Sequence, residues 1–277
     1  MSFSINTSRT PDNLGNCSLI EEIETITHAS ENIIFSQNII NKHSSSSERK
    51  EKFLRQLYSI SNRASDPALY LAVLGEFSSG KSTFINALLR QRLLKSARVA
   101  TTASATYISY GNQLSIKATF LDNECIQATE SNTLKLSQKI SEIKANILQE
   151  IPIKDLIDLV TSDQEVANHV KRIDILLPEA RLKEALSIID TPGIGAGAKY
   201  TTNHSKVTKS LIDESADAAI VLIPSSQAMS DTLISFLRTT ASHFLHRCIF
   251  IITAMDDQEE EERTQIIHFT KRKLQEN

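Results

Sequence analysis

The stretch GEFSSGKST, residues 75–83, has the residue types and the spacing to hold a polyphosphate. It fits the pattern G-x-x-x-x-G-K-[ST], in which backbone N–H groups and the start of a following helix bind an anion. We predict that Lys81 bridges the terminal phosphates and that the Ser82 hydroxyl ligates Mg²⁺. The residues of this stretch predicted to line the ligand are Gly75, Glu76, Phe77, Ser78, Ser79, Gly80, Lys81, Ser82 and Thr83.

A second turn suits the same chemistry. The apolar run LSII ends in DTPG, residues 190–193. We predict that Asp190 holds the magnesium shell through water and that the Gly193 N–H contacts the terminal phosphate. Either turn alone could be an ordinary connection with a solvated lysine or a plain β-turn. With the residues GAG that follow at 195–197, they contain five of the chain's seven glycines, which are placed where the backbone must approach a ligand or move.

The sequence ATTASAT lies between these two turns. A threonine there could bring its hydroxyl to Mg²⁺ and its N–H to the last phosphate, so that the loop orders only when that phosphate is present. We choose Thr102, with Thr101 as the alternative. The predicted catalytic residues are therefore Lys81, Ser82 and Thr102, and the predicted metal site consists of Ser82, Thr102 and, through water, Asp190.

We predict that a fourth stretch, CIFIITAMDDQ, binds the base of a nucleotide. The apolar strand in this stretch ends at Thr253, which we also place in the site. The strand would position Asp256 or, less favoured, Asp257 next to the base. A carboxylate there accepts hydrogen bonds from guanine N1–H and N2–H₂, which adenine does not offer. The ligand is then GTP or GDP, although an aspartate just past a strand is also a common helix cap.

These residues must be positioned by a sheet, because from Ala68 onward short apolar runs alternate with longer helical patterns. The expected strands cover 70–74, 106–110, 114–120, 172–177, 186–189, 218–223 and 248–253. The expected helices cover 82–89, 133–149, 155–170, 201–214, 230–240 and 259–274. This order predicts an α/β fold with a doubly wound, mainly parallel sheet.

Residues 1–66 differ from the rest of the chain. Residues 1–17 are expected to be a disordered tail. Isoleucines and leucines recur at helical spacing between residues 18 and 66, which predicts amphipathic helices that carry no chemistry of their own. The domain with the four motifs would span residues 67–277.

Composition excludes several classes of protein. The net charge is −3, and lysine and arginine do not cluster, so we expect no nucleic-acid partner. The first residues lack the pattern of a secretory signal, and no stretch approaches the apolar length of a membrane span. The three cysteines lie far apart without metal-type spacing. We expect a protein of a reducing, cytoplasmic compartment.

In their order along the chain, GEFSSGKST, ATTA, DTPG and TAMD resemble the nucleotide-binding motifs of the dynamin superfamily, most closely its bacterial dynamin-like members. The resemblance covers about residues 68–275. It implies a P-loop GTPase domain that hydrolyses GTP with Mg²⁺ and pairs with a second GTPase domain across the nucleotide. It also implies a helical neck built from residues 18–65 and a peripheral association with membrane lipids.

Four departures from the family pattern qualify this expectation. Ala254 stands where the guanine motif usually has lysine, and Ala100 where members often have proline. Ile194 and Phe77 occupy positions where other GTPases place a water-orienting glutamine. The chain stops before the last strand and helix of the fold, so we expect an amino-terminal fragment, a truncated product or half of a split protein.

The departures leave a second function open: a weakly hydrolysing nucleotide-binding scaffold that joins a separate chain carrying the missing strand and stalk. A third alternative, an ATPase, would need a pocket that tolerates adenine.

Overall fold

The computed structural model describes residues 68–95, 104–145, 150–195 and 207–276. The chain divides into two units, Met1–Pro67 and Ala68–Asn277, and the description below concerns the second. The predictions for the tail, for the neck-type helices, and for Thr101 and Thr102 fall outside the described residues.

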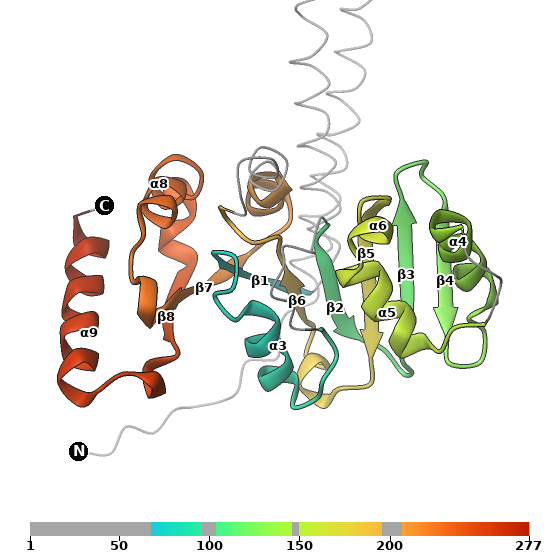
Figure 1. The fold of residues 1–277 in the computed structure, drawn as a ribbon, viewed down its shortest axis with the longest axis horizontal. Coiled ribbons are helices and arrows are strands. Elements are labelled where there is room, and N and C mark those ends of the chain that lie inside the picture. The colour runs from blue at the N-terminus through green and yellow to red at the C-terminus, as the bar shows by residue number, and fades with distance from the viewer. Residues whose placement is uncertain (1–67, 96–103, 146–149, 196–206, 277) are drawn as a thin grey trace, which may run out of the picture. The chain divides into compact units, whose positions relative to one another are not determined.

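The described part of the second unit contains one eight-stranded sheet with the order β4-β3-β5-β2-β6-β1-β7-β8 (Figure 1). Strand β1 pairs in parallel with β6 and β7, as do β7 with β8 and β2 with β5; the other three pairings are antiparallel. The predicted α/β fold with a mainly parallel sheet is confirmed. The strands are β1 Leu69–Gly75, β2 Thr106–Tyr110, β3 Ser115–Phe120, β4 Cys125–Thr129, β5 Val170–Leu177, β6 Leu186–Asp190, β7 Ala218–Pro224 and β8 Cys248–Thr253.

Helices cover both faces of the sheet. Successive strand residues point to opposite sides, and apolar residues on both sides pack against helices. Val73 and Ile188 belong to one buried cluster, which also contains residues of α3, α4, α5 and α6. Ala72 belongs to a second cluster, which contains residues of the helical segment 207–214 and of α8. The helices are α3 Lys81–Leu89, α4 Leu134–Lys144, α5 Ile153–Ser162, α6 Gln164–Ala167, α8 Asp231–Thr239 and α9 Glu260–Gln275, with short 3-10 turns η1 Ala180–Leu182, η2 Ser225–Gln227, η3 Ser242–Arg247 and η4 Met255–Asp257.

Three sequence predictions about elements were wrong in detail. The single helix predicted over 155–170 is two helices, because Asp163 is extended and its side chain accepts hydrogen bonds from two backbone amides of α6. Val170, predicted to be helical, begins β5. The helix predicted over 133–149 ends at Lys144, where Ala145 caps it in the left-handed conformation. Strand β4 was not predicted, because its exposed positions carry polar residues and cysteine.

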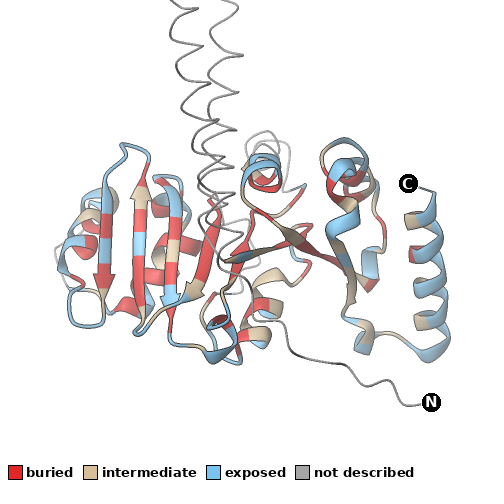
Figure 2. Ribbon diagram, turned by 180° about the vertical axis from the view of Figure 1, so that it is seen from behind, coloured by how far each residue is buried: buried red, intermediate tan, exposed pale blue. Residues whose placement is uncertain are grey.

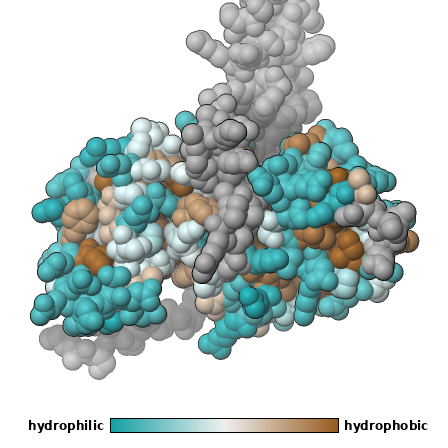
Figure 3. Space-filling model, viewed as in Figure 1, coloured by the Kyte–Doolittle hydropathy of each residue, from teal (hydrophilic) through white to brown (hydrophobic). Residues whose placement is uncertain are grey.

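On the face shown in Figure 3, most of the described residues are hydrophilic, and the hydrophobic residues form small separate patches. None of the helices in the described ranges has both the length and the apolar character needed to cross a membrane.

Candidate nucleotide-binding site

Three of the predicted motifs meet at one edge of the sheet. Strands β6, β1, β7 and β8 are adjacent and parallel, so their carboxyl ends share that edge, where open α/β sheets bind ligands. The Ile194 N–H donates to Gly75 O at 3.1 Å, and the Phe77 N–H donates to Ile194 O at 3.2 Å. Thr253 Oγ1 donates to Ser79 O at 3.2 Å, although these two residues are 174 positions apart. The structure therefore brings residues 75–79, DTPG and the end of β8 together.

The loop between β1 and α3 is tightly turned. A Cβ on Gly75 would lie 2.5 Å from Ser79 Oγ and 2.9 Å from Leu222 O, so only glycine fits there. The exposed residue at the tip, Ser78, has a φ of 62°, which is unusual for a residue other than glycine. Gly80 is the N-cap of α3. This geometry presents the start of α3 at the sheet edge.

Some backbone N–H groups of this loop already have hydrogen-bond partners within the protein, which bears on which of them can bind a phosphate. We predicted that N–H groups from 77 to 82 hold phosphate oxygens. The Phe77 N–H is bonded to Ile194 O, and the Ser79 N–H to Glu76 O at 3.2 Å. An α-helix leaves its first N–H groups without partners in the helix. The beginning of α3, with Lys81 and Ser82, is therefore the main source of donors for an anion.

Lys81 lies in the centre of the site. Its Nζ donates to Gly75 O at 3.0 Å and to Glu76 O at 2.8 Å. Burial lowers the pKa of Lys81, while the nearby carboxylates of Asp190 and Glu76 act in the opposite direction. A partly buried ammonium held at the loop in this way can neutralise the charge of a phosphate.

Gly193 and Ile194 lie directly on the phosphate loop. A Cβ on Gly193 would be 3.0 Å from Phe77 Cα and 3.3 Å from Lys81 Nζ. Ile194 is buried in the apolar cluster that contains residues of α8. Because its side chain is apolar and packed inward, it cannot orient a water molecule.

Asp190 is buried at the end of β6 with an unpartnered Oδ1. Burial raises its pKa to about 6, against the opposing effects of Lys81 and the Thr191 N–H. Thr106 pairs directly with Asp190 across β2 and β6. The Thr106 side chain is also fully buried with an unpartnered hydroxyl.

These orphaned oxygens provide the test of whether the residues fit Mg²⁺. A buried polar atom without a partner is costly, so it indicates a missing donor or ion. Water molecules bound to a magnesium ion are such donors, and Mg²⁺ usually keeps several of them. The unpartnered oxygens of Asp190 and Thr106 therefore fit a hydrated magnesium ion. Sequence reasoning missed Thr106, although strand alternation places it on the same face as Ile108 and could have revealed it.

The predicted base-binding residues lie on the loop after β8. Asp256 and Asp257 both fall in η4 and are exposed, so the choice between them stays a prediction. Ala254 is in the left-handed conformation with a φ of 55°, and its carbonyl accepts a hydrogen bond from Ser225 Oγ at 2.7 Å. Arg263 Nε of α9 donates to Met255 O at 2.8 Å and to Gln258 O at 2.9 Å. Ser225 and Arg263 could not be found from the sequence, because their partners are backbone carbonyls, which every residue has.

Two cavities lie away from this edge. Their volumes are about 360 and 590 Å³, and both are lined by Lys139 and Glu142 of α4. Lys139 is already bound to Asp122 at 2.9 Å and to Glu124 at 2.6 Å. Because its charge is compensated, these cavities are poorer candidates for a phosphate than the edge with Lys81.

Comparisons with known proteins agree with the motifs. The dynamin family profile matches residues 71–255. An uncharacterised protein from the xynA 3′ region of Caldicellulosiruptor sp. is 27% identical over 215 residues, which cover 76% of this chain and 46% of that protein. Dynamin-like protein 1 of Campylobacter jejuni is 24% identical over 220 residues, which cover 74% of this chain and 30% of that protein.

The fold is similar to that of a solved bacterial dynamin. A structure described as an oligomerised bacterial dynamin pair, with a mechanism for long-range sensing and tethering of membranes, has a TM-score of 0.54 at 20% identity. The match covers 97% of this chain and 37% of that one. The chain thus spans less than half the length of each of these three proteins.

Proposed function

The chain belongs to the dynamin family, and on this basis we propose that its GTPase domain binds GTP and hydrolyses it to GDP and phosphate with Mg²⁺. One observation carries the proposal. Two segments that are distant in the sequence, the DTPG turn with Ile194 and the end of β8, reach the phosphate loop through the hydrogen bonds of Ile194, Phe77 and Thr253. A convergence of this kind supports a triphosphate at the start of α3 with its base toward the loop after β8.

Each predicted residue has a role in this proposal. Lys81 neutralises the terminal phosphates, and the first amides of α3 hold their oxygens. Ser82 and Thr102 would ligate Mg²⁺, and Asp190 would hold one of its water molecules. Magnesium supplies charge neutralisation between the phosphates when it is bound. Asp256 selects guanine by accepting its N1–H and N2–H₂ groups.

Catalysis in the isolated domain should be slow. The positions where other GTPases carry a water-orienting glutamine are Phe77 and the buried Ile194. Neither side chain can hydrogen-bond a water molecule. We propose that a second GTPase domain, paired across the nucleotide, completes the site. The hydrolysis rate per chain should then rise with protein concentration, and a rate independent of concentration would exclude this pairing.

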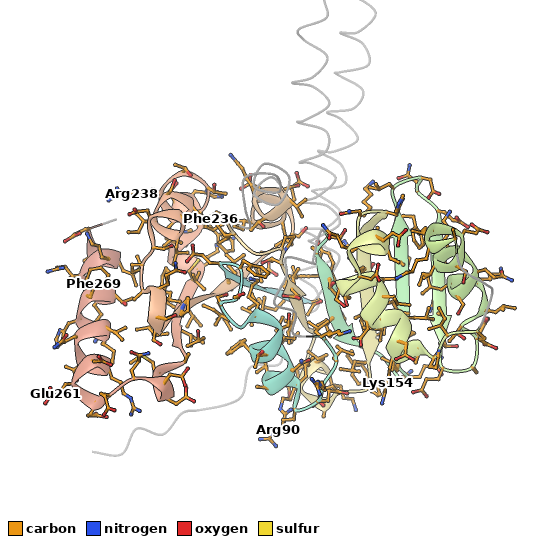
Figure 4. All side chains as sticks on the ribbon, in the orientation of Figure 1. Arg90, Lys154, Phe236, Arg238, Glu261 and Phe269 are labelled. Atoms are coloured by element: carbon orange, nitrogen blue, oxygen red, sulfur yellow. The ribbon has the colours of Figure 1, made fainter. Side chains whose placement is uncertain are left out.

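Binding of GTP to the purified chain tests the core of the proposal. We expect calorimetric binding that needs Mg²⁺ and that Lys81→Ala weakens by about a hundredfold or more, since a charge-assisted contact to the phosphates is lost. Lys154→Ala is the matched control, because Lys154 is exposed on α5 (Figure 4) and should leave affinity unchanged. A folded wild-type chain that ignores triphosphates in magnesium buffer would refute the function.

Base selectivity tests Asp256. Asparagine presents an N–H donor where aspartate presents only acceptors, so Asp256→Asn should shift preference from GTP toward XTP. The adjacent Asp257→Asn is the control and should keep GTP preference. If Asp257→Asn causes the shift instead, the base contact belongs to Asp257. ATP that binds as well as GTP to the wild type would favour the ATPase alternative.

A second candidate function is a nucleotide-binding scaffold that hydrolyses little. The supporting observation is strand β8, which has β7 as its hydrogen-bonded neighbour in the described ranges and carries Ile249 with 60% of its surface exposed. An open strand edge can accept another strand, here from a second chain. Saturating GTP with negligible turnover at every protein concentration would favour this candidate over the GTPase.

Membrane association is part of the proposal through family membership alone. The measurement is sedimentation of the chain with vesicles rich in phosphatidylglycerol, with and without GTP. No sedimentation in either condition would remove membrane binding from the proposed function of this chain.

A further inference from the structure

The loop that carries Asp256 has little packing of its own. The turn η4 contains no buried residue, and both Ala254 and Asp256 are exposed. Ala254 also adopts a left-handed conformation, which is unfavourable for a residue with a Cβ. A loop with these properties keeps one geometry only if other elements bind its backbone.

Two of the bonds to this loop act on its first half. Thr253 Oγ1 donates to Ser79 O of the phosphate loop, and Ser225 Oγ donates to Ala254 O. Both bonds fix the chain before it reaches Met255. They leave the direction of the following residues, including Asp256, undetermined.

The second half of the loop is held by Arg263. Its Nε–H is shared between Met255 O at 2.8 Å and Gln258 O at 2.9 Å, and these carbonyls flank Asp256 on both sides. Its Nη1 binds Glu260 Oε2 at 3.2 Å, which orients the guanidinium from within α9. The arginine side chain is 39% exposed, so water screens these bonds only in part. The second half of the loop is therefore held by hydrogen bonds from the Arg263 guanidinium group.

We propose that Arg263 is a positioning residue for guanine recognition: it holds the Asp256 carboxylate in place where the usual motif lysine is replaced by Ala254. The proposal rests on the proposed function of the site. Arg263 does not touch the nucleotide. It acts through Asp256, so its loss affects binding of the base and leaves binding of the phosphates unchanged.

Arg263→Ala, measured by calorimetry in magnesium buffer, separates these effects. We expect the affinity for GTP to fall about tenfold, as for the loss of charge-assisted hydrogen bonds. The affinity for inorganic triphosphate, which has no base, should stay within twofold. The ratio of the GTP affinity to the ATP affinity should fall as well, because Asp256 recognises guanine and not adenine. Arg263→Lys should recover part of the loss, because lysine can still donate to the carbonyls but lacks the planar fork.

A double-mutant cycle tests whether Arg263 acts through Asp256. In an Asp256→Ala background, Arg263→Ala should have no further effect on GTP affinity. Arg272→Ala is the matched control on the same helix, because Arg272 is exposed and pairs with Glu276 at its end. This control should leave every affinity unchanged.

The outcomes are distinct. Equal losses for GTP and inorganic triphosphate, or an additive loss in the Asp256→Ala background, would overturn the positioning role while leaving the GTPase proposal intact. A GTP affinity of Arg263→Ala equal to that of the wild type would do the same. A wild-type chain that binds GTP no better than inorganic triphosphate would refute base recognition, and this inference with it.

Discussion

The two halves of the candidate site are built differently. The phosphate half rests on β1 and β6, whose last four residues in each strand are buried. The base half rests on β8, where no residue is fully buried, and on α9, where Thr270 is the one buried residue. Figure 2 shows this contrast between the mostly buried central strands and the mostly exposed α9. Glu261 and Phe269, both labelled in Figure 4, are among the exposed residues of α9.

The difference implies two ways of fixing a binding group. Burial fixes Asp190 and steric limits fix Gly193, while Lys81 donates to two carbonyls of the tightly turned loop. Single hydrogen bonds from Thr253, Ser225 and Arg263 hold the base loop. Regions with few buried contacts open at lower free energy than a packed core. We therefore expect the phosphate half to respond to changes in volume and charge, and the base half to the loss of single bonds.

Core truncation should show the contrast most strongly. Ile188 is fully buried in β6, and Ile188→Ala should lower the free energy of unfolding by about 3 to 4 kcal/mol, because it loses apolar burial and leaves a cavity. Ile267 on α9 is 37% exposed, and Ile267→Ala should cost below about 1 kcal/mol. Urea denaturation measures both values. Equal losses would show that α9 is packed as firmly as the phosphate half.

The buried carboxyl of Asp190 should make the phosphate half sensitive to pH. Its pKa in the folded chain is about 6, against an ordinary value of 3.8. Between these values the folded chain retains a proton that the unfolded chain has lost, so stability falls as pH rises through this window. The full cost, on the order of 3 kcal/mol, is present above about pH 6.

Comparison with Asp190→Asn isolates this effect. The variant lacks the titrating group, so its stability relative to the wild type should rise from pH 4 to pH 6 in nucleotide-free protein with chelator. Thermal midpoints over this range measure the difference. A constant difference between the two proteins would contradict the raised pKa.

Added volume in the phosphate half should be the next largest effect. A Cβ on Gly193 would come within 3.0 Å of Phe77 Cα and 3.1 Å of Phe77 N, both backbone atoms that cannot rotate away. Gly193→Ala should therefore destabilise the fold by about 1 to 3 kcal/mol. Guanidinium denaturation checks this value. Unchanged stability would mean that the DTPG segment can move off the phosphate loop without cost.

The phosphate half was also the more predictable from sequence. Its glycines and lysine form a local pattern with one dominant interpretation. The strands β1 and β7 are nearly continuous apolar runs, and β6 is apolar except for Ser187 and Asp190. The sheet edge with their carboxyl ends follows from the alternation of strands and helices. The structure brings Lys81, Asp190 and Gly193 close to one another, while their roles in binding stay predictions and Thr102 lies outside the described residues.

The base half and the sheet extension were less predictable. Arg263 donates hydrogen bonds to backbone carbonyls. Because every residue has a carbonyl, the amino-acid sequence does not indicate which ones Arg263 binds. Within the described ranges, strand β4 pairs with β3 alone and exposes every second residue. Polar side chains and a cysteine at its exposed positions interrupt the apolar pattern by which a strand is predicted. The end of α5 depends on Asp163, whose capping role competes with an otherwise continuous helical pattern.

Thr106 tests the magnesium environment with a smaller effect on stability. Thr106→Val removes an unpartnered buried hydroxyl while keeping the shape, so the nucleotide-free fold should be unchanged or more stable by about 1 kcal/mol. The increase in GTP affinity caused by Mg²⁺ should shrink severalfold, because a donor-acceptor group beside Asp190 is lost.

The control for this change is Thr161→Val in α5. Thr161 is buried as well, but its Oγ1 donates to Ile157 O at 2.7 Å, far from the site in the sequence. It should lose a little stability and keep the full magnesium effect. A magnesium effect that survives Thr106→Val unchanged would remove Thr106 from the site.

The smallest predicted effect concerns the backbone of the base loop. Ala254 has a φ of 55°, and glycine adopts this conformation without the steric cost of a Cβ. Ala254→Gly should therefore stabilise the fold by about 0.5 kcal/mol, because the added freedom of the unfolded chain offsets part of the gain. Thermal unfolding measures this change.

A lysine at the same position tests base binding instead. Ala254→Lys keeps the strained backbone but supplies a side-chain stem that can lie along the base, so it should raise the affinity for GTP and leave the affinity for inorganic triphosphate unchanged. Loss of GTP affinity in Ala254→Lys would show that the loop held by Arg263 has no room for that stem.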